Sequence, residues 1–347
     1  MAHFRILSVD GGGTRGIIPA TILHCIYKVT GKHPTEIFPL LAGTSTGGIL
    51  CTGLAYGLST QEMIDLYLKQ SKQIFYDTGW DNFRDGFGKN LGADYSTKRF
   101  RTIVNRLFGK STLYDIYKKY NGNVDLMVCS FDLNPIKDGK PVNFRPKVFH
   151  SDFIKDMNTK LSDLCLMTSA GPTYFPIYDH KYIDGGVSLN NPAMAALSYA
   201  INDSSSMIKE YRHQDGVRRG LGKDMSELKI FSLGCGTSNA NRISKEVIKE
   251  NNDGDWGNIQ WIKYLPDLLT ESNVQAADYY VEQLIGSRYK RIQIYFDQPD
   301  IPQILKQKQP GIDVKDPKLL QAMHEYTVEY CDQEMDNILD FLALTDS

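Results

Sequence analysis

Between residues 4 and 18 the chain reads FRILSVDGGGTRGII. The apolar run from Phe4 to Val9 has the length of a buried strand, and it ends in Asp10 and three consecutive glycines. Residues 17–29 follow with apolar side chains at helical spacing. A strand, a tight turn and a helix in succession favour a parallel α/β arrangement, because parallel strands are usually joined by a crossover helix.

The next segment of the chain repeats this plan. Residues 37–42 form a second apolar run, residues 43–47 form a turn, and residues 48–56 continue as a helix rich in small side chains. Two strand-turn-helix units in succession predict a mostly parallel sheet with helices on both faces. Further strands are expected at residues 124–131, 142–149, 181–183, 229–233 and 289–295.

Two later helices carry signals for their first residues. Ser59 and Glu62 fit a capping box before a helix over residues 61–75. Asp316 and Pro317 begin a long amphipathic helix that closes the chain over about residues 317–343. No repeat, low-complexity tract or linker interrupts the sequence. We therefore expect residues 1–347 to form a single domain.

The composition is that of an ordinary globular protein. The 347 residues are 41% hydrophobic and 23% charged with a net charge of -2, so no nucleic-acid polymer is indicated as a partner. The six cysteines lie far apart without metal-ligand spacing, and we expect reduced thiols and no metal site. The N-terminus lacks a signal-peptide pattern, and no run of about 18 apolar residues occurs. These features predict a cytoplasmic protein whose membrane contact is peripheral.

Residues 43–47 read GTSTG, which fits the G-x-S-x-G pattern of a serine nucleophile at a sharp strand-to-helix turn. Gly43 and Gly47 leave room for such a turn, and Ser45 would stand exposed above the sheet. Because Ser45 would also begin a helix, the helix dipole would favour negative charge on its oxygen. The place of the motif between an apolar run and a helix favours a catalytic Ser45 over a chance match.

A serine nucleophile needs N–H donors for the oxyanion of its tetrahedral intermediate. The consecutive glycines Gly11, Gly12 and Gly13 can turn several backbone N–H groups toward one oxyanion. The same segment also fits G-x-G-x-x-G through Gly11, Gly13 and Gly16, so a dinucleotide-dependent oxidoreductase is the rival interpretation. That rival requires an acidic residue at the end of the second strand, which instead runs into Gly43 and the serine turn. A glycine-rich turn without a ligand is the third alternative.

The base that would activate Ser45 is a histidine or an aspartate. None of the seven histidines lies in a context that marks it as catalytic, and His180 is the only one close to another motif. Asp184 is favoured because it follows an apolar run and precedes Gly185 and Gly186. An aspartate with a pKa of about 3.9 is a weaker base than histidine, so such a pair depends more on desolvation and on the oxyanion donors. Alone, Asp-Gly-Gly is more often a turn.

Three motifs together resemble the patatin-like phospholipase family. They are the turn at residues 10–16, GTSTGG at residues 43–48 and DGG at residues 184–186, in family order. Residues 17–23, 130–132, 170–176 and 232–237 are also similar to family segments, so the resemblance covers about residues 4–296. It implies a three-layer α/β/α patatin-like fold with a mostly parallel central sheet.

The resemblance also implies a set of site residues. Ser45 and Asp184 would form a Ser-Asp dyad that uses neither a histidine nor a cofactor, and the backbone N–H groups of residues 11–13 would form the oxyanion hole. Arg15 stands where the family often has a basic residue. Gly186 stands where plant members usually have alanine.

The expected activity is hydrolysis of ester bonds in membrane phospholipids through an acyl-enzyme. The chain is also similar to patatin-type effectors of bacterial antiphage systems, which cyclic oligonucleotides switch on. This similarity implies a cyclic di- or trinucleotide activator and action at the inner face of the membrane. A signal-binding module with a vestigial hydrolase site is the alternative. Positional specificity, headgroup preference and a homo-oligomeric state stay open.

Two further segments have a functional and a structural interpretation. Residues 74–100 carry seven aromatic side chains among glycines and charges, and form either a mobile cap that touches lipid or a loop packed on the domain. Six basic side chains between residues 209 and 223 form either a solvated loop or an anion site.

Overall fold

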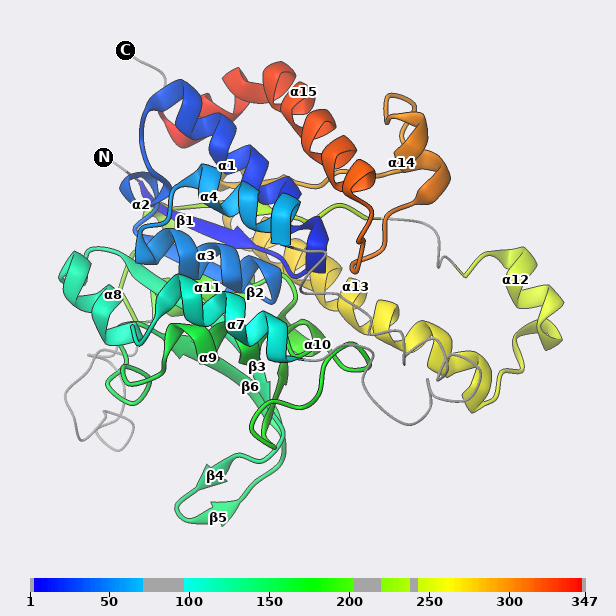
Figure 1. Cartoon of the computed structure of the whole chain (residues 1–347), viewed down its shortest axis with the longest axis horizontal. Helices are drawn as coiled ribbons and strands as arrows, with labels where there is room; N and C mark the ends of the chain where they lie inside the picture. Colours follow the sequence, from blue (N-terminus) through cyan, green and yellow to red (C-terminus); the bar gives the residue numbers. More distant parts are fainter. Residues whose placement is uncertain (1–2, 71–96, 203–219, 238–242, 345–347) are drawn as a thin grey trace.

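The computed structural model describes residues 3–70, 97–202, 220–237 and 243–344 (Figure 1). The strands of its central sheet are β1 (Phe4–Val9), β2 (Leu40–Thr44), β3 (Asp125–Asp132), β6 (Arg145–His150), β7 (Tyr182–Asp184), β8 (Leu228–Leu233) and β9 (Tyr289–Ile292). Their order is β6-β3-β2-β1-β8-β9, with β7 paired to β3 beside this path. β6 and β7 run antiparallel to β3, and the other neighbouring strands pair in parallel. The predicted mostly parallel sheet is confirmed.

Helices cover both faces of this sheet, so the chain forms three layers (Figure 1). The helices of one face are α1 (Ile17–Thr30), α3 (Thr46–Tyr56), α4 (Thr60–Asp65), α7 (Thr97–Phe108), α8 (Leu113–Tyr120), α9 (Leu161–Thr168) and α15 (Pro317–Leu342). The other face carries α11 (Ala193–Ile201) and the buried side of α13 (Asn258–Ile285). The predicted α/β/α architecture is confirmed.

Successive residues of each parallel strand enter different cores. Ile6 packs on the α11 side of the sheet and Leu7 on the α1 side, and Leu40 and Leu41 divide in the same way. Because side chains alternate across a strand, a sheet covered on both faces needs apolar residues at nearly every position. This requirement explains why the strands read as continuous apolar runs rather than as alternating patterns.

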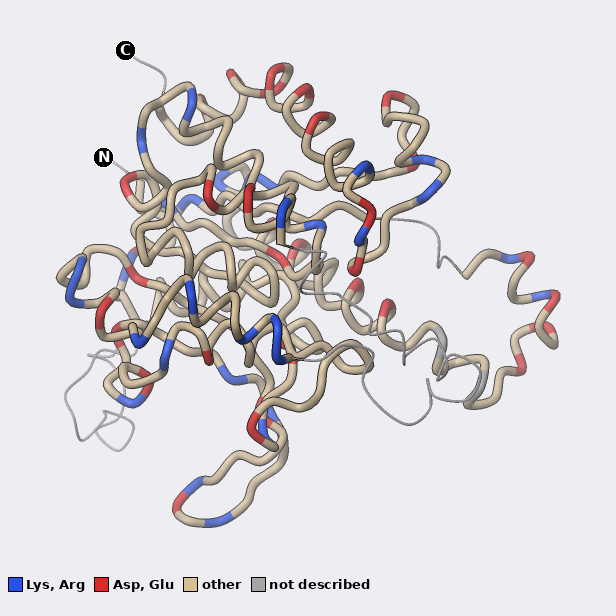
Figure 2. Tube along the Cα trace, in the orientation of Figure 1, with Lys and Arg blue, Asp and Glu red and all other residues tan. Residues whose placement is uncertain are grey.

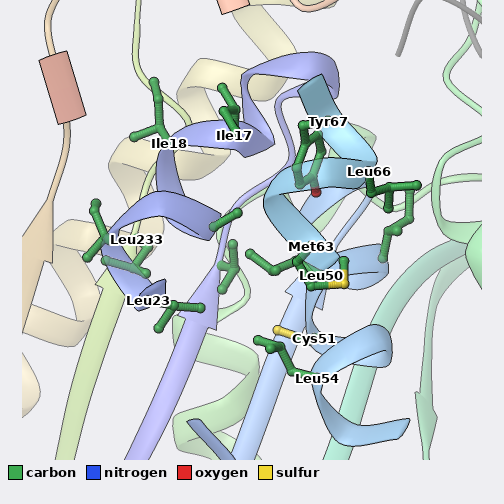
Figure 3. Close-up of a cluster of buried hydrophobic side chains, with 14 of the residues drawn as sticks. Ile17, Ile18, Leu23, Leu50, Cys51, Leu54, Met63, Leu66, Tyr67 and Leu233 are labelled. Carbon is green, nitrogen blue, oxygen red and sulfur yellow. The ribbon is translucent and has the colours of Figure 1, made fainter. Parts of the chain in front are cut away.

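Figure 3 shows part of the larger core, on the α1 side of the sheet. Leu23 of α1, Leu50 and Leu54 of α3 and Met63 of α4 are each at most 1% exposed. Burying one such side chain contributes roughly 1.5–3 kcal/mol. The helix that follows each of the first two motifs is therefore fixed firmly against the sheet, and the turns before these helices are fixed with it.

The second predicted unit differs from the structure in where its strand begins. β2 begins at Leu40, whereas Ile37 ends the short helix α2 (Pro34–Ile37). The side chain of His33 accepts a hydrogen bond from the backbone N–H of Thr35, and Pro34 occupies the first turn. An N-cap and a proline at the first helical position favour a helix over the apolar run that suggested a strand.

The helix expected at residues 61–75 is confirmed only in its first part. The capping box of Ser59 and Glu62 is present, and α4 extends from Thr60 to Asp65 before a π-helical turn over Leu66–Gln70. The rest of that prediction lies outside the described residues. At the C-terminus, the side chain of Asp316 caps α15 as expected, by accepting from the backbone N–H of Lys318 at 2.9 Å.

Three elements near the later strands were missed or displaced. The strand expected at residues 142–149 is β6, which begins at Arg145, because the chain first forms a separate hairpin of β4 (Ile136–Lys137) and β5 (Lys140–Pro141). β9 ends at Ile292, short of the predicted end at residue 295. The 28-residue helix α13, which contains Pro266, was not predicted as a helix. The remaining short helices are α10 (Gly186–Leu189), α12 (Lys245–Glu250) and α14 (Gln303–Lys308).

Among the helices in the described ranges, none has both the length and the apolar composition to span a bilayer. All six cysteines are unpaired, and all except the half-buried Cys25 are buried. Most of the aromatic segment, residues 74–96, lies outside the described residues, as do residues 209–219 of the basic segment. Phe100 at the end of the aromatic segment is buried on α7, and the Lys223 ammonium lies 5.1 Å from the centre of the Phe4 ring.

Candidate active site

Ser45 lies where β2 turns sharply into α3. Its φ of 53° and ψ of -121° are unfavourable for a residue with a side chain, so the surrounding structure must hold it in place. The backbone N–H of Ser45 donates to Thr168 Oγ1 at 2.8 Å. A Cβ at Gly43 would lie 2.3 Å from the carbonyl oxygen of Gly47, so the turn closes tightly on itself. The result is a strained elbow that places the hydroxyl at the carboxyl end of the parallel strands. Ser45 is only 8% exposed and lines a cavity, so the prediction that it stands exposed above the sheet is wrong.

Gly47 supports this elbow through its contact with β1. A Cβ at this position would lie 2.2 Å from the carbonyl oxygen of Val9, a backbone atom that cannot rotate away. We expect Gly47→Ala to lower the free energy of unfolding by about 1–3 kcal/mol, because overpacking forces the backbone to shift. Urea denaturation followed by circular dichroism measures this loss. Gly257→Ala is the control, because a Cβ there meets only the end of the Gln260 side chain at 3.5 Å; equal stability of the two variants would contradict the contact.

Asp184 reaches Ser45 because β3 is longer than β2. Their pairing ends at Thr44, opposite Cys129. Beyond that point β7 pairs with Ser130, Phe131 and Asp132, while β6 pairs with the same three residues of β3. Since a strand has two edges, β7 must occupy the edge that β2 leaves free. Asp184 is therefore the residue of β7 nearest to the end of β2.

The two side chains form a hydrogen bond. The Ser45 hydroxyl donates to Asp184 Oδ2 at 2.7 Å, and the backbone N–H of Gly186 donates to Asp184 Oδ1 at 2.7 Å. Burial raises the pKa of Asp184 to about 6, against the opposing effect of these two hydrogen bonds. A carboxylate with this pKa is a better proton acceptor than an ordinary aspartate and is still ionised at neutral pH.

The glycine-rich segment passes directly beside Ser45. A Cβ at Gly11 would lie 3.1 Å from Ser45 Cβ, and the N–H of Gly11 already donates to the carbonyl oxygen of Asn190 at 3.1 Å. In the described part of the chain, the N–H groups of Gly12 and Gly13 have no hydrogen-bond partner. Gly13 has a φ of 59°, and a Cβ there would lie 1.9 Å from the carbonyl oxygen of Ile312. Two adjacent N–H groups are thus available in the wall of the cavity that Ser45 also lines, whereas the N–H of Gly11, predicted as a third donor, is already paired.

Of the other predicted motif residues, Gly16 and Gly185 allow close packing, and Arg15 lines the cavity. A Cβ at Gly16 would lie 2.3 Å from Thr46 Oγ1, and one at Gly185 would lie 2.5 Å from the carbonyl oxygen of Cys129. Arg15 is half-buried, and its Nη1 donates to the carbonyl oxygen of Pro310 at 3.5 Å. Burial lowers the pKa of Arg15. Gly16 and Gly185 therefore let their turns approach α3 and β3, whereas Arg15 adds a positive charge to the wall of the cavity.

A buried ion pair holds the residue before the glycines. Arg291 of β9 donates to both carboxylate oxygens of Asp10, at 2.9 and 2.6 Å, and its Nε lies 3.3 Å from Asp278 Oδ2. Asp10 is 3% exposed and Arg291 is 14% exposed. Burial lowers the pKa of Arg291, but the charges of Asp10 and Asp278 raise it more, so the guanidinium stays charged. The bidentate geometry fixes the start of the glycine-rich segment against β8 and β9.

Helix α13 also supports both halves of the site. The side-chain oxygen of Asn273 accepts from the backbone N–H of Asn190 at 2.7 Å, and its amide donates to the carbonyl oxygen of Gly186 at 2.9 Å. Asn190 in turn accepts from Gly11, and Gly186 donates to Asp184. Sequence reasoning missed Arg291, Asn190 and Asn273. The adjacent asparagines before Pro192 were the only local signal.

Ser45 and Asp184 lie in a cavity of about 1010 Å³. One wall is the N-terminal part of α13, where the exposed side chains Ile262, Leu265 and Leu269 are 69%, 44% and 51% accessible. None of the described histidines lines this cavity, and His180 is an exposed residue whose carbonyl accepts from Asn134. Within the described ranges, no three His, Cys, Asp or Glu residues lie close enough to hold a metal ion.

Comparisons with known proteins identify bacterial and plant relatives of this chain. The chain is 32% identical over 228 residues to a cGAMP-activated phospholipase of Vibrio cholerae, covering 61% of each chain. It is 33% identical over 216 residues to a cGAMP-activated phospholipase of Escherichia coli, covering 58% of this chain and 57% of that one. It is 25% identical to Patatin-12 of Solanum tuberosum, covering 82% of this chain and 73% of that one. The match to the two bacterial proteins thus spans about three fifths of their length.

A family model supplies the broader assignment. The model described as patatin-like phospholipase matches residues 7–197, more than half of the chain. This range includes the glycine-rich segment, the serine elbow and Asp184. The chain therefore belongs to the patatin-like phospholipase family.

Proposed function

We propose that this chain hydrolyses ester bonds of membrane phospholipids with a Ser45–Asp184 dyad. The observation that carries the proposal is the 2.7 Å hydrogen bond from the Ser45 hydroxyl to Asp184 Oδ2 inside the cavity. A nucleophilic serine needs a base within this distance, and the described residues lining the cavity include no histidine for the task. The strained conformation of Ser45 also fits a residue held for function.

The reaction would proceed through an acyl-enzyme. Asp184 accepts the proton of the Ser45 hydroxyl as its oxygen attacks the ester carbonyl, and the N–H groups of Gly12 and Gly13 stabilise the resulting oxyanion. The ester C–O bond breaks, and the leaving lysophospholipid takes the proton from Asp184. Asp184 then accepts a proton from water, whose oxygen attacks the acyl group. Release of the fatty acid returns the proton to Ser45.

The α13 side of the cavity supports a lipid substrate. The apolar residues Ile262, Leu265, Leu268 and Leu269 line it, each of them at least 41% exposed. Exposed apolar side chains gain free energy when hydrocarbon covers them, at about 25 cal/mol per Å². An acyl chain lying along these residues would bring its carbonyl toward Ser45. A dinucleotide would bring no such hydrocarbon, and β2 leads into Ser45 rather than into an acidic residue.

We propose further that a cyclic di- or trinucleotide activates the enzyme, which then acts at the inner face of the membrane. The support is similarity to two bacterial proteins that are named as cGAMP-activated phospholipases. An enzyme that degrades phospholipid would damage its own cell unless a signal restrained it. The alternative, a signal-binding module with a vestigial site, predicts nucleotide binding without ester turnover.

The test is fatty-acid release from phosphatidylcholine–phosphatidylglycerol vesicles, with and without a panel of cyclic di- and trinucleotides. A short-chain nitrophenyl ester serves as the soluble substrate. We expect vesicle hydrolysis that depends on one nucleotide of the panel. Full hydrolysis without any nucleotide would support the proposed hydrolase activity but refute the proposed activation by a nucleotide. A nucleotide that raises the melting temperature without turnover of either substrate would refute the hydrolase in favour of the vestigial module.

A further inference from the structure

The hairpin of β4 and β5 projects from the body of the molecule (Figure 1). All residues from 136 to 146 are exposed. At the tip, Asp138 and Gly139 both have positive φ, 51° and 74°, as a two-residue type I′ turn requires. β4 and β5 pair only with each other among the described strands. The protein therefore maintains a protruding ribbon that contributes little to either core.

The hairpin nevertheless carries large apolar side chains. Phe144 is 67% exposed, Ile136 is 58% exposed and Val142 is 37% exposed. Phe144 keeps a partial contact with the sheet, because its ring centre lies 5.8 Å from that of Phe131. Ile136 pairs with Pro141, so Ile136 and Val142 face opposite sides of the ribbon. Single exposed apolar residues are common, but several of them on both faces of one isolated ribbon indicate a binding surface.

The charge of the hairpin differs from that of the whole chain. Residues 136–145 contain Lys137, Lys140 and Arg145 against Asp138, a net charge of +2, whereas the complete chain has a net charge of -2. Figure 2 shows the lysines on both sides of the acidic residue at the tip. Apolar side chains beside lysines match the interface of an anionic bilayer, where hydrocarbon lies beneath negative headgroups.

The hairpin also leaves the sheet at its catalytic end. It follows the last residue of β3, Asp132, which pairs with Tyr182, two residues before Asp184. An apolar groove of about 400 Å³ lies nearby, lined by Leu133 and Ile183 and by the loop residues Pro172, Phe175 and Ile177. Pro172 and Phe175 also line the catalytic cavity. Ile177, in the same loop, is 54% exposed. Apolar surface thus runs from the base of the hairpin to the cavity.

We propose that the β4–β5 hairpin docks the protein on anionic phospholipid bilayers. Ile136, Val142 and Phe144 enter the interface, and Lys137 and Lys140 contact the headgroups. Each lysine near such a surface contributes about 1 kcal/mol. The proposal deepens the proposed function, since it names the surface that brings the cavity to its substrate, but binding of bilayers can be measured without catalysis.

The experiment measures co-sedimentation of the full chain with phosphatidylcholine–phosphatidylglycerol vesicles, in the Ser45→Ala background. Two double variants are compared with this parent. The apolar variant combines Ile136→Ser and Phe144→Ser, and the charge variant combines Lys137→Glu and Lys140→Glu. We expect each to lower the vesicle partition coefficient about 10-fold or more, as the loss of two such contacts implies. On vesicles of pure phosphatidylcholine, the charge variant should bind as well as the parent, whereas the apolar variant should still bind more weakly.

Matched controls lie at the other end of the sheet. α1 runs back along β1, so its exposed residue Val29 and the exposed Lys28 and Lys32 are remote from the hairpin. The single variant Val29→Ser is the control for the apolar variant, and the double variant Lys28→Glu, Lys32→Glu is the control for the charge variant. Both should leave vesicle binding unchanged. In the Ser45 background, the hairpin variants should hydrolyse the soluble ester within about twofold of wild type. Unchanged vesicle binding by both hairpin variants would overturn the proposal. A change in oligomeric mass without a change in vesicle binding would also overturn it, because the hairpin would then contact another copy of the chain. Loss of soluble-ester hydrolysis with vesicle binding intact would also overturn it.

Discussion

Ser45→Ala is expected to lower kcat for ester hydrolysis by about 1000-fold or more, because it removes the hydroxyl that Asp184 would deprotonate. Asp184→Asn should cause a loss of similar order, since an amide cannot accept the serine proton. Both variants should keep the melting temperature of the wild type within a few degrees, because neither changes side-chain volume by much. Turnover of a soluble nitrophenyl ester, measured beside thermal unfolding, checks both statements.

Two conservative variants serve as controls. Ser169 lines the same cavity, but its hydroxyl donates to the carbonyl oxygen of Cys165 in α9. Asp179 lies in the turn before β7, the strand that carries Asp184, and is exposed. Ser169→Ala and Asp179→Asn should keep most of the activity. An Asp184→Asn variant as active as Asp179→Asn would remove Asp184 from the proposed mechanism, whatever the behaviour of Ser45→Ala.

Arg291→Met is expected to lower the free energy of unfolding by about 3–5 kcal/mol, the usual cost of leaving one charge of a buried pair alone. The charge left behind is Asp10, which is 3% exposed. Because native proteins are stable by only about 5–15 kcal/mol, this is a large fraction of the total. Asp10 begins the glycine-rich segment, so kcat for the soluble ester should fall as well. Urea denaturation at neutral pH measures the stability.

The neighbouring Lys290→Met is the control. Its ammonium donates to the carbonyl oxygen of Asn337 at 3.3 Å and forms no ion pair with a carboxylate among the described residues. This variant should stay within about 1 kcal/mol of wild type. The double variant Asp10→Asn, Arg291→Met should recover part of the loss, because it no longer buries an unpaired charge. A single Arg291→Met variant as stable as Lys290→Met would show that the pair does not hold the segment.

Local signals in the sequence were sufficient for the elements around Ser45. β1, α1 and α3 follow from apolar runs, glycines and helical spacing within about 50 residues. The contact between Ser45 and Asp184 joins positions 139 apart in the chain, and it depends on β7 pairing with the end of β3 that β2 does not reach. That pairing is a property of the whole sheet, so the residues alone could suggest the dyad only through the order of the motifs.

The supporting residues could not be predicted for a related reason. Arg291 contacts Asp10 across 281 positions, and an arginine in a strand has many ordinary explanations. α13 was missed because it contains Pro266 and exposes apolar residues, which obscures the pattern of an amphipathic helix. The β4–β5 hairpin did carry a signal, Asp138-Gly139 at the turn, but its strands are only two residues each.

Labelling with a fluorophosphonate, followed by peptide mapping, tests the central claim most directly, because the reagent reacts only with an activated serine. The wild type, with the nucleotide panel present, should carry the label on Ser45. Since Asp184 must be ionised and burial raises its pKa to about 6, the labelling rate should rise with pH through that value. Asp184→Asn should label far more slowly at every pH. A label on another residue, or equal labelling of Asp184→Asn and wild type, would contradict a Ser45–Asp184 dyad.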